Sequence, residues 1–184
     1  ITIPSRLFTN YIGYLKDETL NLSIEEGNVL LIKTSDSTTK IKGIPSSEFP
    51  PIPPLEKEGG CVLSAKDLKE AIHQVVFAAS LNTTRPILSG VYFNIQKDQL
   101  ILVATDSYRL AEKKIKVQKP QGEFHCIIPA RTLIEVGNIL DLDGDIKNEE
   151  VEIQVSKNQV LFLINETRIT SRLIEGQFPN YQQI

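Results

Sequence analysis

The sequence has no methionine, only two cysteines, and no apolar run near the roughly 18 residues needed to span a bilayer. Cys61 and Cys126 are too few and too far apart for a disulfide framework or a metal-ligand set, so we expect reduced core thiols. No basic-then-apolar leader opens the chain, which favours a cytoplasmic protein without membrane contact. Because the chain begins at Ile1 and lacks methionine, we expect a fragment whose ends cut through domains.

A basic excess is also missing, since the formal net charge is −3. Proteins that grip nucleic acid by neutralising many phosphates usually carry a marked positive charge. A local basic face on a mildly acidic body would still steer a duplex while keeping each contact weak. The composition therefore argues against strong overall phosphate binding and leaves DNA open as a partner.

No arrangement of residues predicts an active site. His73 and His125 have neither the spacing of a zinc site nor a nucleophile in a recognisable elbow. The acidic segment at residues 141–145 (DLDGD) has the charge of a calcium loop, but Ile146 stands where an EF-hand needs glycine. No phosphate-cradling glycine loop occurs. We therefore expect no catalytic residue, metal or cofactor.

Internal self-similarity is the most informative feature of the chain. Residues 3–15 (IPSRLFTNYIGYL) resemble residues 128–140 (IPARTLIEVGNIL). Both segments have apolar residues at helical spacing after the arginine, and both are followed by strand-like runs. Each copy closes at a Phe-Pro pair, at residues 49–50 and 178–179.

A third copy lies between these two. A short strand-like run precedes Ser64, which predicts a helix N-cap, and apolar residues within 68–79 fall on one helical face. Strand-like runs follow from residue 91, the first two joined by a predicted turn at Lys97 and Asp98. The repeated unit is therefore strand, helix and three strands.

One such unit cannot close a core alone, so we expect the units to pair. The proline-rich residues 50–54 (PPIPP) and the polar residues 56–60 predict an extended connector between domains. Residues 118–122 (QKPQG) predict only a short turn. We therefore expect residues 59–184 to form one complete domain, and residues 1–58 to be the second half of a preceding domain plus its linker.

Two further motifs complete a resemblance to a known family. Residues 85–93 (RPILSGVYF) and 104–111 (ATDSYRLA), with the IPAR helix and the closing QFPNY at 177–181, resemble the middle domain of the bacterial DNA sliding clamp family, the beta subunit of DNA polymerase III. The resemblance implies an α+β DNA clamp fold, with helices on one side and antiparallel sheets on the other. It implies a noncatalytic processivity factor of DNA replication, a homodimeric ring that encircles duplex DNA and tethers the polymerase, the clamp loader and repair proteins. The family's third domain is absent from this chain.

In this family the helices line the hole, and a hydrophobic cleft receives partner peptides. The resemblance implies DNA-facing residues on three helices and on the loop after the middle one: Arg6, Lys66, Lys69, Asn82, Thr83 and Arg131. It implies a peptide pocket walled by Arg85, Leu88, Thr105, Ser107, Tyr108, Arg109, Leu110, Pro179 and Ile184. Tyr108 stands where the family often has histidine, and Gln183 where it often has arginine, so we expect an effect on partner preference.

Two other functions remain open on the residues alone. A metal-dependent hydrolase or nuclease would need Asp106, Asp141 and Asp143 to converge in one cleft. An adaptor of repeated units would bind peptides without encircling DNA. Lys66 and Lys69 are also explained as ordinary solvated helix charges.

Overall fold

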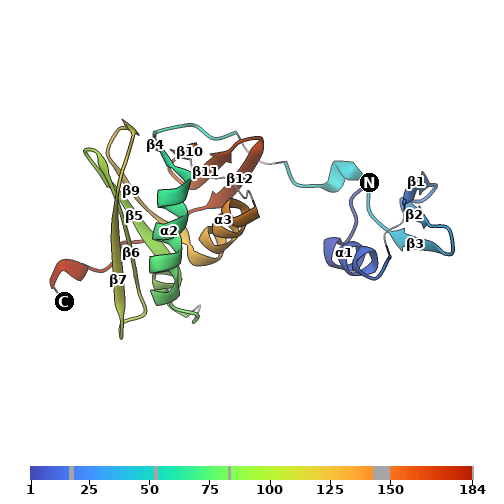
Figure 1. Ribbon diagram of the computed structural model, residues 1–184, viewed down its shortest axis with the longest axis horizontal. Coiled ribbons are helices and arrows are strands. Elements are labelled where there is room, and N and C mark those ends of the chain that lie inside the picture. The colour runs from blue at the N-terminus through green and yellow to red at the C-terminus, as the bar shows by residue number, and fades with distance from the viewer. Residues whose placement is uncertain (17–18, 52–53, 83, 143–149, 184) are drawn as a thin grey trace. The chain divides into compact units, whose positions relative to one another are not determined.

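The computed structural model describes residues 1–16, 19–51, 54–82, 84–142 and 150–183. The chain divides into two compact units, an N-terminal unit of Ile1–Pro53 and a C-terminal unit of Pro54–Ile184, whose elements are labelled in Figure 1. The division lies inside the proline-rich connector. No helix of the described residues is long and apolar enough to cross a membrane.

The N-terminal unit combines one helix with one small antiparallel sheet. Its elements are α1 (Ser5–Gly13), β1 (Asn21–Glu25), β2 (Val29–Lys33), β3 (Thr38–Lys42) and the 3-10 turn η1 (Ser46–Glu48), with the strands in the order β1-β2-β3. Phe8 and Tyr11 of α1 pack against a core of Leu30, Ile32 and Ile41. The first strand expected for this copy is reduced to a single bridge, between residues 2 and 44.

This unit buries little apolar surface. No residue of α1 is fully buried. Leu7 of the helix and Leu22 and Ile24 of β1 are large apolar side chains that remain exposed. The apolar helix face that the sequence predicts is therefore only partly used, by Phe8 and Tyr11.

The C-terminal unit contains two copies of the predicted strand, helix and three strands. The first copy comprises β4 (Gly59–Ser64), α2 (Ala65–Val75), the 3-10 turns η2 (Val76–Ala78) and η3 (Pro86–Ser89), β5 (Gly90–Gln96), β6 (Gln99–Thr105) and β7 (Leu110–Lys116). The second comprises β9 (Phe124–Pro129), α3 (Ala130–Leu142), β10 (Glu150–Val155), β11 (Gln159–Ile164) and β12 (Thr167–Arg172). A short β8 (Lys119–Gln121) joins the copies, and η5 (Tyr181–Gln183) ends the described chain.

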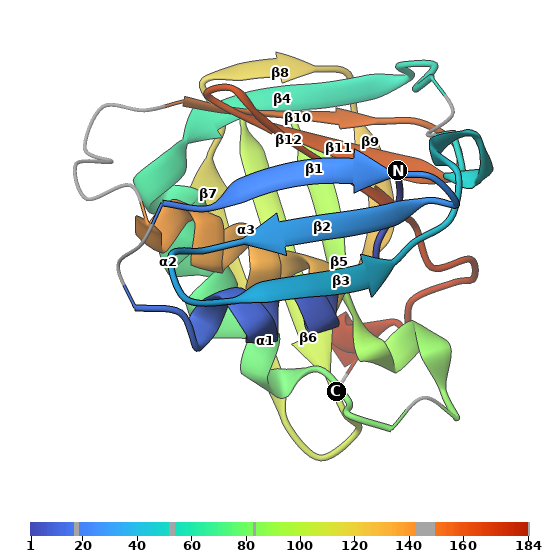
Figure 2. The same cartoon turned by 90° about the vertical axis from the view of Figure 1, so that its right-hand side faces the viewer.

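The two copies exchange their first strands. The five-stranded sheet has the order β12-β11-β10-β4-β8, so β4 of the first copy pairs with β10 of the second. The four-stranded sheet has the order β7-β6-β5-β9, so β9 of the second copy pairs with β5 of the first. All these pairings are antiparallel, and Figure 2 shows the five-stranded sheet running across the strands of the other. Neither copy forms a complete sheet alone.

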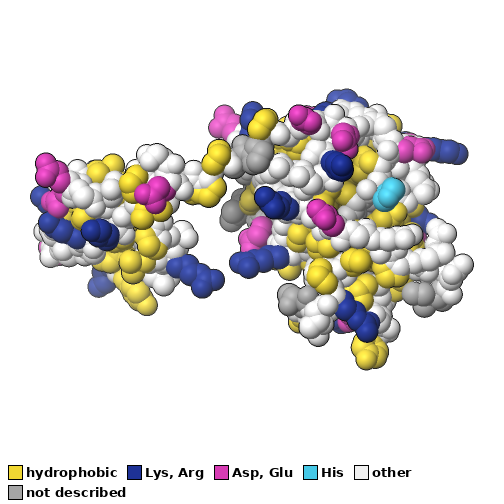
Figure 3. Space-filling model, turned by 180° about the vertical axis from the view of Figure 1, so that it is seen from behind, with side chains coloured by type: hydrophobic (Ala, Val, Ile, Leu, Met, Phe, Trp, Pro, Cys, Tyr) yellow, Lys and Arg dark blue, Asp and Glu magenta, His cyan; other side chains and the backbone are white. Residues whose placement is uncertain are grey.

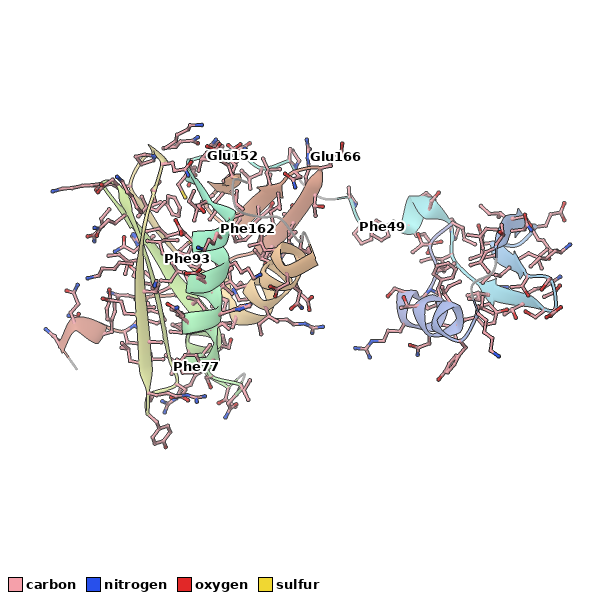
Figure 4. All side chains as sticks on the ribbon, viewed as in Figure 1. Phe49, Phe77, Phe93, Glu152, Phe162 and Glu166 are labelled. Atoms are coloured by element: carbon pink, nitrogen blue, oxygen red, sulfur yellow. The ribbon has the colours of Figure 1, made fainter. Side chains whose placement is uncertain are left out.

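Both copies bury their apolar faces in one shared core. The core joins Leu68 and Ile72 of α2 and Leu133 of α3 to inward-facing residues of both sheets. Phe93 and Phe162, one from each sheet, lie fully buried within it (Figure 4). The expected pairing of two repeat copies around one core is therefore confirmed for the C-terminal unit.

Both cysteines belong to this core. Cys61 and Cys126 are free and buried. Burial raises the pKa of each thiol to about 12, because a thiolate in an apolar interior loses its hydration. The expectation of core thiols is confirmed.

Local sequence signals explain the ends of several elements. Ser64 caps α2, with its hydroxyl accepting the Asp67 N–H at 3.4 Å, as the sequence predicts. The predicted turn at Lys97 and Asp98 closes the β5–β6 hairpin, with Lys97 at a positive φ of 55°. Asn165, at φ 50°, begins the turn that joins β11 to β12 in the second copy.

Strand β6 is buried on both faces, in agreement with its nearly continuous run of apolar residues. Leu100 and Leu102 face the helices in the main core. Ile101 and Val103 face the opposite side, where Phe178 and the chain that follows β12 cover them. The covering segment continues as a strap whose aromatic side chains stack on the outer face of the sheet, with the Tyr92 and Phe178 rings 5.1 Å apart.

Two sequence expectations about connections are wrong in detail. The segment at residues 118–122 is not merely a turn, because β8 pairs with β4 and extends the five-stranded sheet. The connector also ends earlier than expected, since the Glu58 N–H already donates to the carbonyl of Val155 at 2.9 Å. Backbone pairing with a distant strand decides both cases, and no local pattern predicts such pairing.

A side-chain contact strengthens the end of the connector. Lys57 Nζ lies 2.9 Å from Glu152 Oε1, and Gln154 Nε2 donates to the same oxygen at 2.9 Å. The hydrogen bond from Lys57 is the main cause that holds the pKa of Glu152 below its ordinary value of 4.5. Figure 4 shows Glu152 at the end of the unit where the connector enters.

We expect Glu152→Gln to lower the melting temperature of the C-terminal unit slightly at pH 7, by the equivalent of less than about 1 kcal/mol. A carboxyl group with a depressed folded pKa stabilises the fold above its unfolded pKa, and that stabilisation is lost as the pH falls through the folded value. The difference between wild type and variant, measured by calorimetry, should therefore begin to shrink as the pH falls below 4.5 and vanish once the pH lies below the lowered folded pKa. A difference that persists unchanged in acid would contradict the role of the ion pair.

Candidate functional site

The turn between β6 and β7 is built around the carboxylate of Asp106. Its Oδ1 accepts the N–H groups of Tyr108 at 3.0 Å and Arg109 at 3.1 Å. Its Oδ2 accepts a hydrogen bond from Arg109 Nε at 3.0 Å. The backbone N–H of Tyr108 is the largest cause that lowers the pKa of Asp106, so this group is a charged anchor of the turn.

Thr105 stabilises the same turn from its buried side. Its side chain is 4% exposed, and its hydroxyl donates to the Arg109 carbonyl at 2.7 Å and accepts the Ser107 N–H at 3.1 Å. Ser107 has a positive φ of 79°, a conformation that non-glycine residues seldom adopt. The hydrogen bonds of Thr105 and Asp106 therefore hold a backbone that would not form this turn unaided.

The guanidinium of Arg109 also has an aromatic partner. Its Cζ lies 5.6 Å from the ring centroid of Phe77, in η2 directly after α2. Figure 4 shows Phe77 at the lower end of the helix, away from the core phenylalanines. Asp106 and Phe77 thus orient one arginine from two sides.

A hollow of about 520 Å³ lies beside this turn, formed by residues 79–82, 84–85, 88 and 106–109. Large apolar side chains stand at its edge, with Leu81 99% exposed and Tyr108 97% exposed. Arg85 and Arg109 contribute two guanidinium groups to its lining. Exposed apolar groups beside a few fixed polar groups are typical of a site for a peptide or protein partner.

The structure brings together part of the expected peptide pocket. Arg85, Leu88, Ser107, Tyr108 and Arg109 line this one hollow. The other expected members lie elsewhere: Thr105 is buried beneath the turn, Leu110 is 40% exposed at the start of β7, Pro179 lines a separate hollow of about 260 Å³, and Ile184 lies outside the described residues.

Sequence reasoning missed two residues of this region. Neither Phe77 nor Leu81 is among the site residues that the sequence predicts. A signal for Phe77 exists, because it is a large apolar residue just beyond the amphipathic helix. Its contact with Arg109 depends on the fold and is not predictable from spacing.

The expected DNA-facing residues are spread over both units. Arg6 of α1 and Arg131 of α3 are exposed in the first turns of their helices. Asn82 is held within its own loop, where its Oδ1 accepts the Thr84 N–H at 3.0 Å, and Thr83 lies outside the described residues.

The two lysines of α2 are paired with acids. Lys66 Nζ lies 3.9 Å from Glu70 Oε1, and Lys69 forms an ion pair with Asp141 of α3. That contact is the main cause that lowers the pKa of Asp141. In Figure 3, acidic and basic side chains are interspersed over the face of the C-terminal unit that it shows.

The expected hydrolase site finds no support in these contacts. Asp106 is committed to its turn, and Asp141 to Lys69 and His73. Asp143 lies outside the described residues. Across those ranges, no group of three or more His, Cys, Asp or Glu side chains is arranged to hold a metal ion.

The strand-exchanged pair of copies places the C-terminal unit in the class of DNA sliding clamp domains, and solved structures support this. The Bacillus subtilis DNA polymerase sliding clamp superposes with a TM-score of 0.85 at 30% identity, over 98% of this chain and 47% of that one. The DNA polymerase III beta chain of Streptococcus pneumoniae gives 0.82 at 34% identity, over 97% and 46%.

Sequence comparison gives the family. The model of the DNA polymerase III beta subunit central domain matches residues 62–180. A beta sliding clamp from Halalkalibacterium halodurans is 35% identical over 183 residues, covering 97% of this chain and 47% of the relative. The chain belongs to the DNA polymerase III beta subunit family, and it spans about half the length of the curated relatives that it matches.

We expect Thr105→Val to destabilise the C-terminal unit by about 1–3 kcal/mol, because it removes two part-buried hydrogen bonds that hold the turn. Thr105→Ser keeps the hydroxyl and loses one methyl group, so its cost should be about 1 kcal/mol or less. Urea unfolding of both variants measures the difference. Equal losses would indicate that packing, not hydrogen bonding, holds the turn.

Proposed function

We propose that this chain is part of a noncatalytic DNA sliding clamp, a processivity factor of bacterial replication that acts in the cytoplasm. The names of its relatives and its membership of the DNA polymerase III beta subunit family support this function. In a protein of the relatives' length, two protomers would close a ring around duplex DNA. Polymerase, clamp loader and repair proteins would attach through short peptides.

Within such a ring, residues 59–184 would be the middle domain, and residues 1–58 the end of the first domain plus its linker. The match to the family's central domain at residues 62–180 supports this division. The strand exchange supports it as well, because residues from 59 onward supply every strand of two complete sheets.

The docking of partner peptides is supported by one observation, the rigid β6–β7 turn and the hollow beside it. A partner peptide in extended form needs an apolar seat for anchor side chains and fixed groups for its polar backbone. Leu88, Tyr108 and Leu81 supply apolar surface, and the oriented Arg109 supplies donors. The exposed Leu110 would extend the apolar wall beside the turn.

Four basic residues of the helices would face DNA, together with two polar residues of the adjoining loop: Arg6, Lys66, Lys69, Arg131, Asn82 and Thr83. Topological enclosure does not require tight phosphate binding, because a closed ring leaves DNA only by opening or by sliding off an end. A formal charge of −3 with scattered basic residues is compatible with contacts that exchange quickly.

We expect Leu110→Asp to weaken binding of a fluorescein-labelled clamp-binding peptide from a replicative polymerase by at least about tenfold, since a carboxylate would replace apolar wall at the anchor site. Fluorescence anisotropy measures the affinity. Leu22→Asp, a matched change at a leucine 52% exposed in the N-terminal unit, should bind as wild type does. Equal affinities for all three proteins would remove Leu110 from the pocket.

For a protein of the relatives' full length, loaded by a clamp loader, we expect retention on nicked circular DNA at high salt and rapid loss after the circle is cut. A protein held only by electrostatic attraction would leave both the circular and the cut DNA at high salt, because salt screens each phosphate contact. Gel filtration of loaded complexes before and after linearisation measures retention. Equal retention on both forms would contradict encirclement.

A further inference from the structure

Helices α2 and α3 meet along an antiparallel seam. Lys69 of α2 contacts Asp141 in the last turn of α3. One turn further along α2, His73 lies against Gly137, which is one turn earlier in α3, and a Cβ at Gly137 would stand 3.4 Å from His73 Nε2. The residue numbers therefore run in opposite directions along the contact.

Asp141 occupies an electrostatically unfavourable place that Lys69 compensates. The last turn of a helix carries the negative end of its dipole, so a carboxylate there needs a cation. Lys69 contacts Asp141 Oδ1, and His73 Nε2 lies 3.6 Å from Oδ2. The ammonium group of Lys69 therefore already has an anionic partner within the protein.

The charges of the two helices show the same compensation more widely. Across the described residues of α2 and α3, the lysine and arginine side chains are Lys66, Lys69 and Arg131, the one histidine is His73, and the acidic side chains are Asp67, Glu70, Glu135 and Asp141. Lys66 has Glu70 one turn away on its own helix at 3.9 Å. Lys69 and His73 of α2 both contact Asp141 of α3, so Asp141 joins one helix to the other.

We propose, resting on the proposed DNA-binding role, that Asp141 competes with DNA phosphates for Lys69 and so weakens the grip of the α2–α3 surface on a duplex. When no phosphate is near, the Asp141 carboxylate occupies the position beside the Lys69 ammonium group that a phosphate oxygen would take. A phosphate must displace it to contact Lys69, and the carboxylate recaptures the ammonium when the phosphate leaves. Short-lived contacts of this kind suit a surface along which DNA slides.

The test compares Asp141→Asn with Glu135→Gln. Both variants remove one negative charge from α3, but Glu135 is exposed, and its carboxylate accepts a hydrogen bond from Asn138 of the same helix at 3.3 Å. Binding of a short fluorescein-labelled DNA duplex is measured by anisotropy over a range of NaCl concentrations. Asp141→Ser is a second variant, and thermal melting establishes that each protein is folded.

We expect Asp141→Asn and Asp141→Ser to bind the duplex at least about threefold more tightly than Glu135→Gln at low salt. Freeing one lysine for one more phosphate should also steepen the slope of log K against log salt concentration by about 0.9. Adding Lys69→Gln to Asp141→Asn should remove both effects, because the freed cation is then absent. A merely structural role for Asp141 would lower the melting temperature without changing the salt slope.

Equal affinities and slopes for Asp141→Asn and Glu135→Gln would overturn the competition and leave the DNA-binding role intact. Retention of the gain after Lys69→Gln would overturn it as well, since another cation would be responsible. Absence of duplex binding by every variant at the lowest salt would instead overturn the proposed DNA-binding role of this surface, and with it the competition.

Discussion

The exchange of first strands between the two copies is the constraint on which the C-terminal unit depends. Strand β4 completes the sheet of the second copy, and β9 completes the sheet of the first. Gly60 shows how close this pairing is, because a Cβ at that position would clash with the carbonyl of Ile153. Since each helix follows directly from an exchanged strand, the same pairing brings α2 and α3 together over one core.

The hollow beside the β6–β7 turn also follows from this arrangement. Strand β6 ends beside the end of α2, so the turn that leaves β6 meets the aromatic residue that leaves the helix. Thr105 and Asp106 satisfy the backbone of the turn, which frees its side chains to face outward. A rigid scaffold thus carries a short exposed recognition segment, an arrangement that keeps the ordering cost of binding low.

The helix surface follows a different principle. Lys66 and Lys69 do not form a strongly basic patch, because each is paired with an acid on the same or the neighbouring helix. In the proposed clamp, the electrostatic attraction of this surface to a duplex would be weak, in keeping with an acidic chain that would hold DNA by enclosure. Under the proposed function, one surface would be preorganised for partner proteins and the other would be suited to weak contact with DNA.

The sequence by itself determined the repeated strand, helix and three strands, the Ser64 cap and the turn at Lys97, because periodicity and capping act over a few residues. Its motifs also placed five pocket residues that the structure brings to one hollow. Only the tertiary structure decided that β8 joins a sheet, that Pro179 lies apart, that Phe77 orients Arg109 and that Lys69 meets Asp141. Each of these depends on strand register and packing between segments far apart in the chain. Such contacts are stabilised by residues that are not neighbours in the sequence, so no local pattern predicts them.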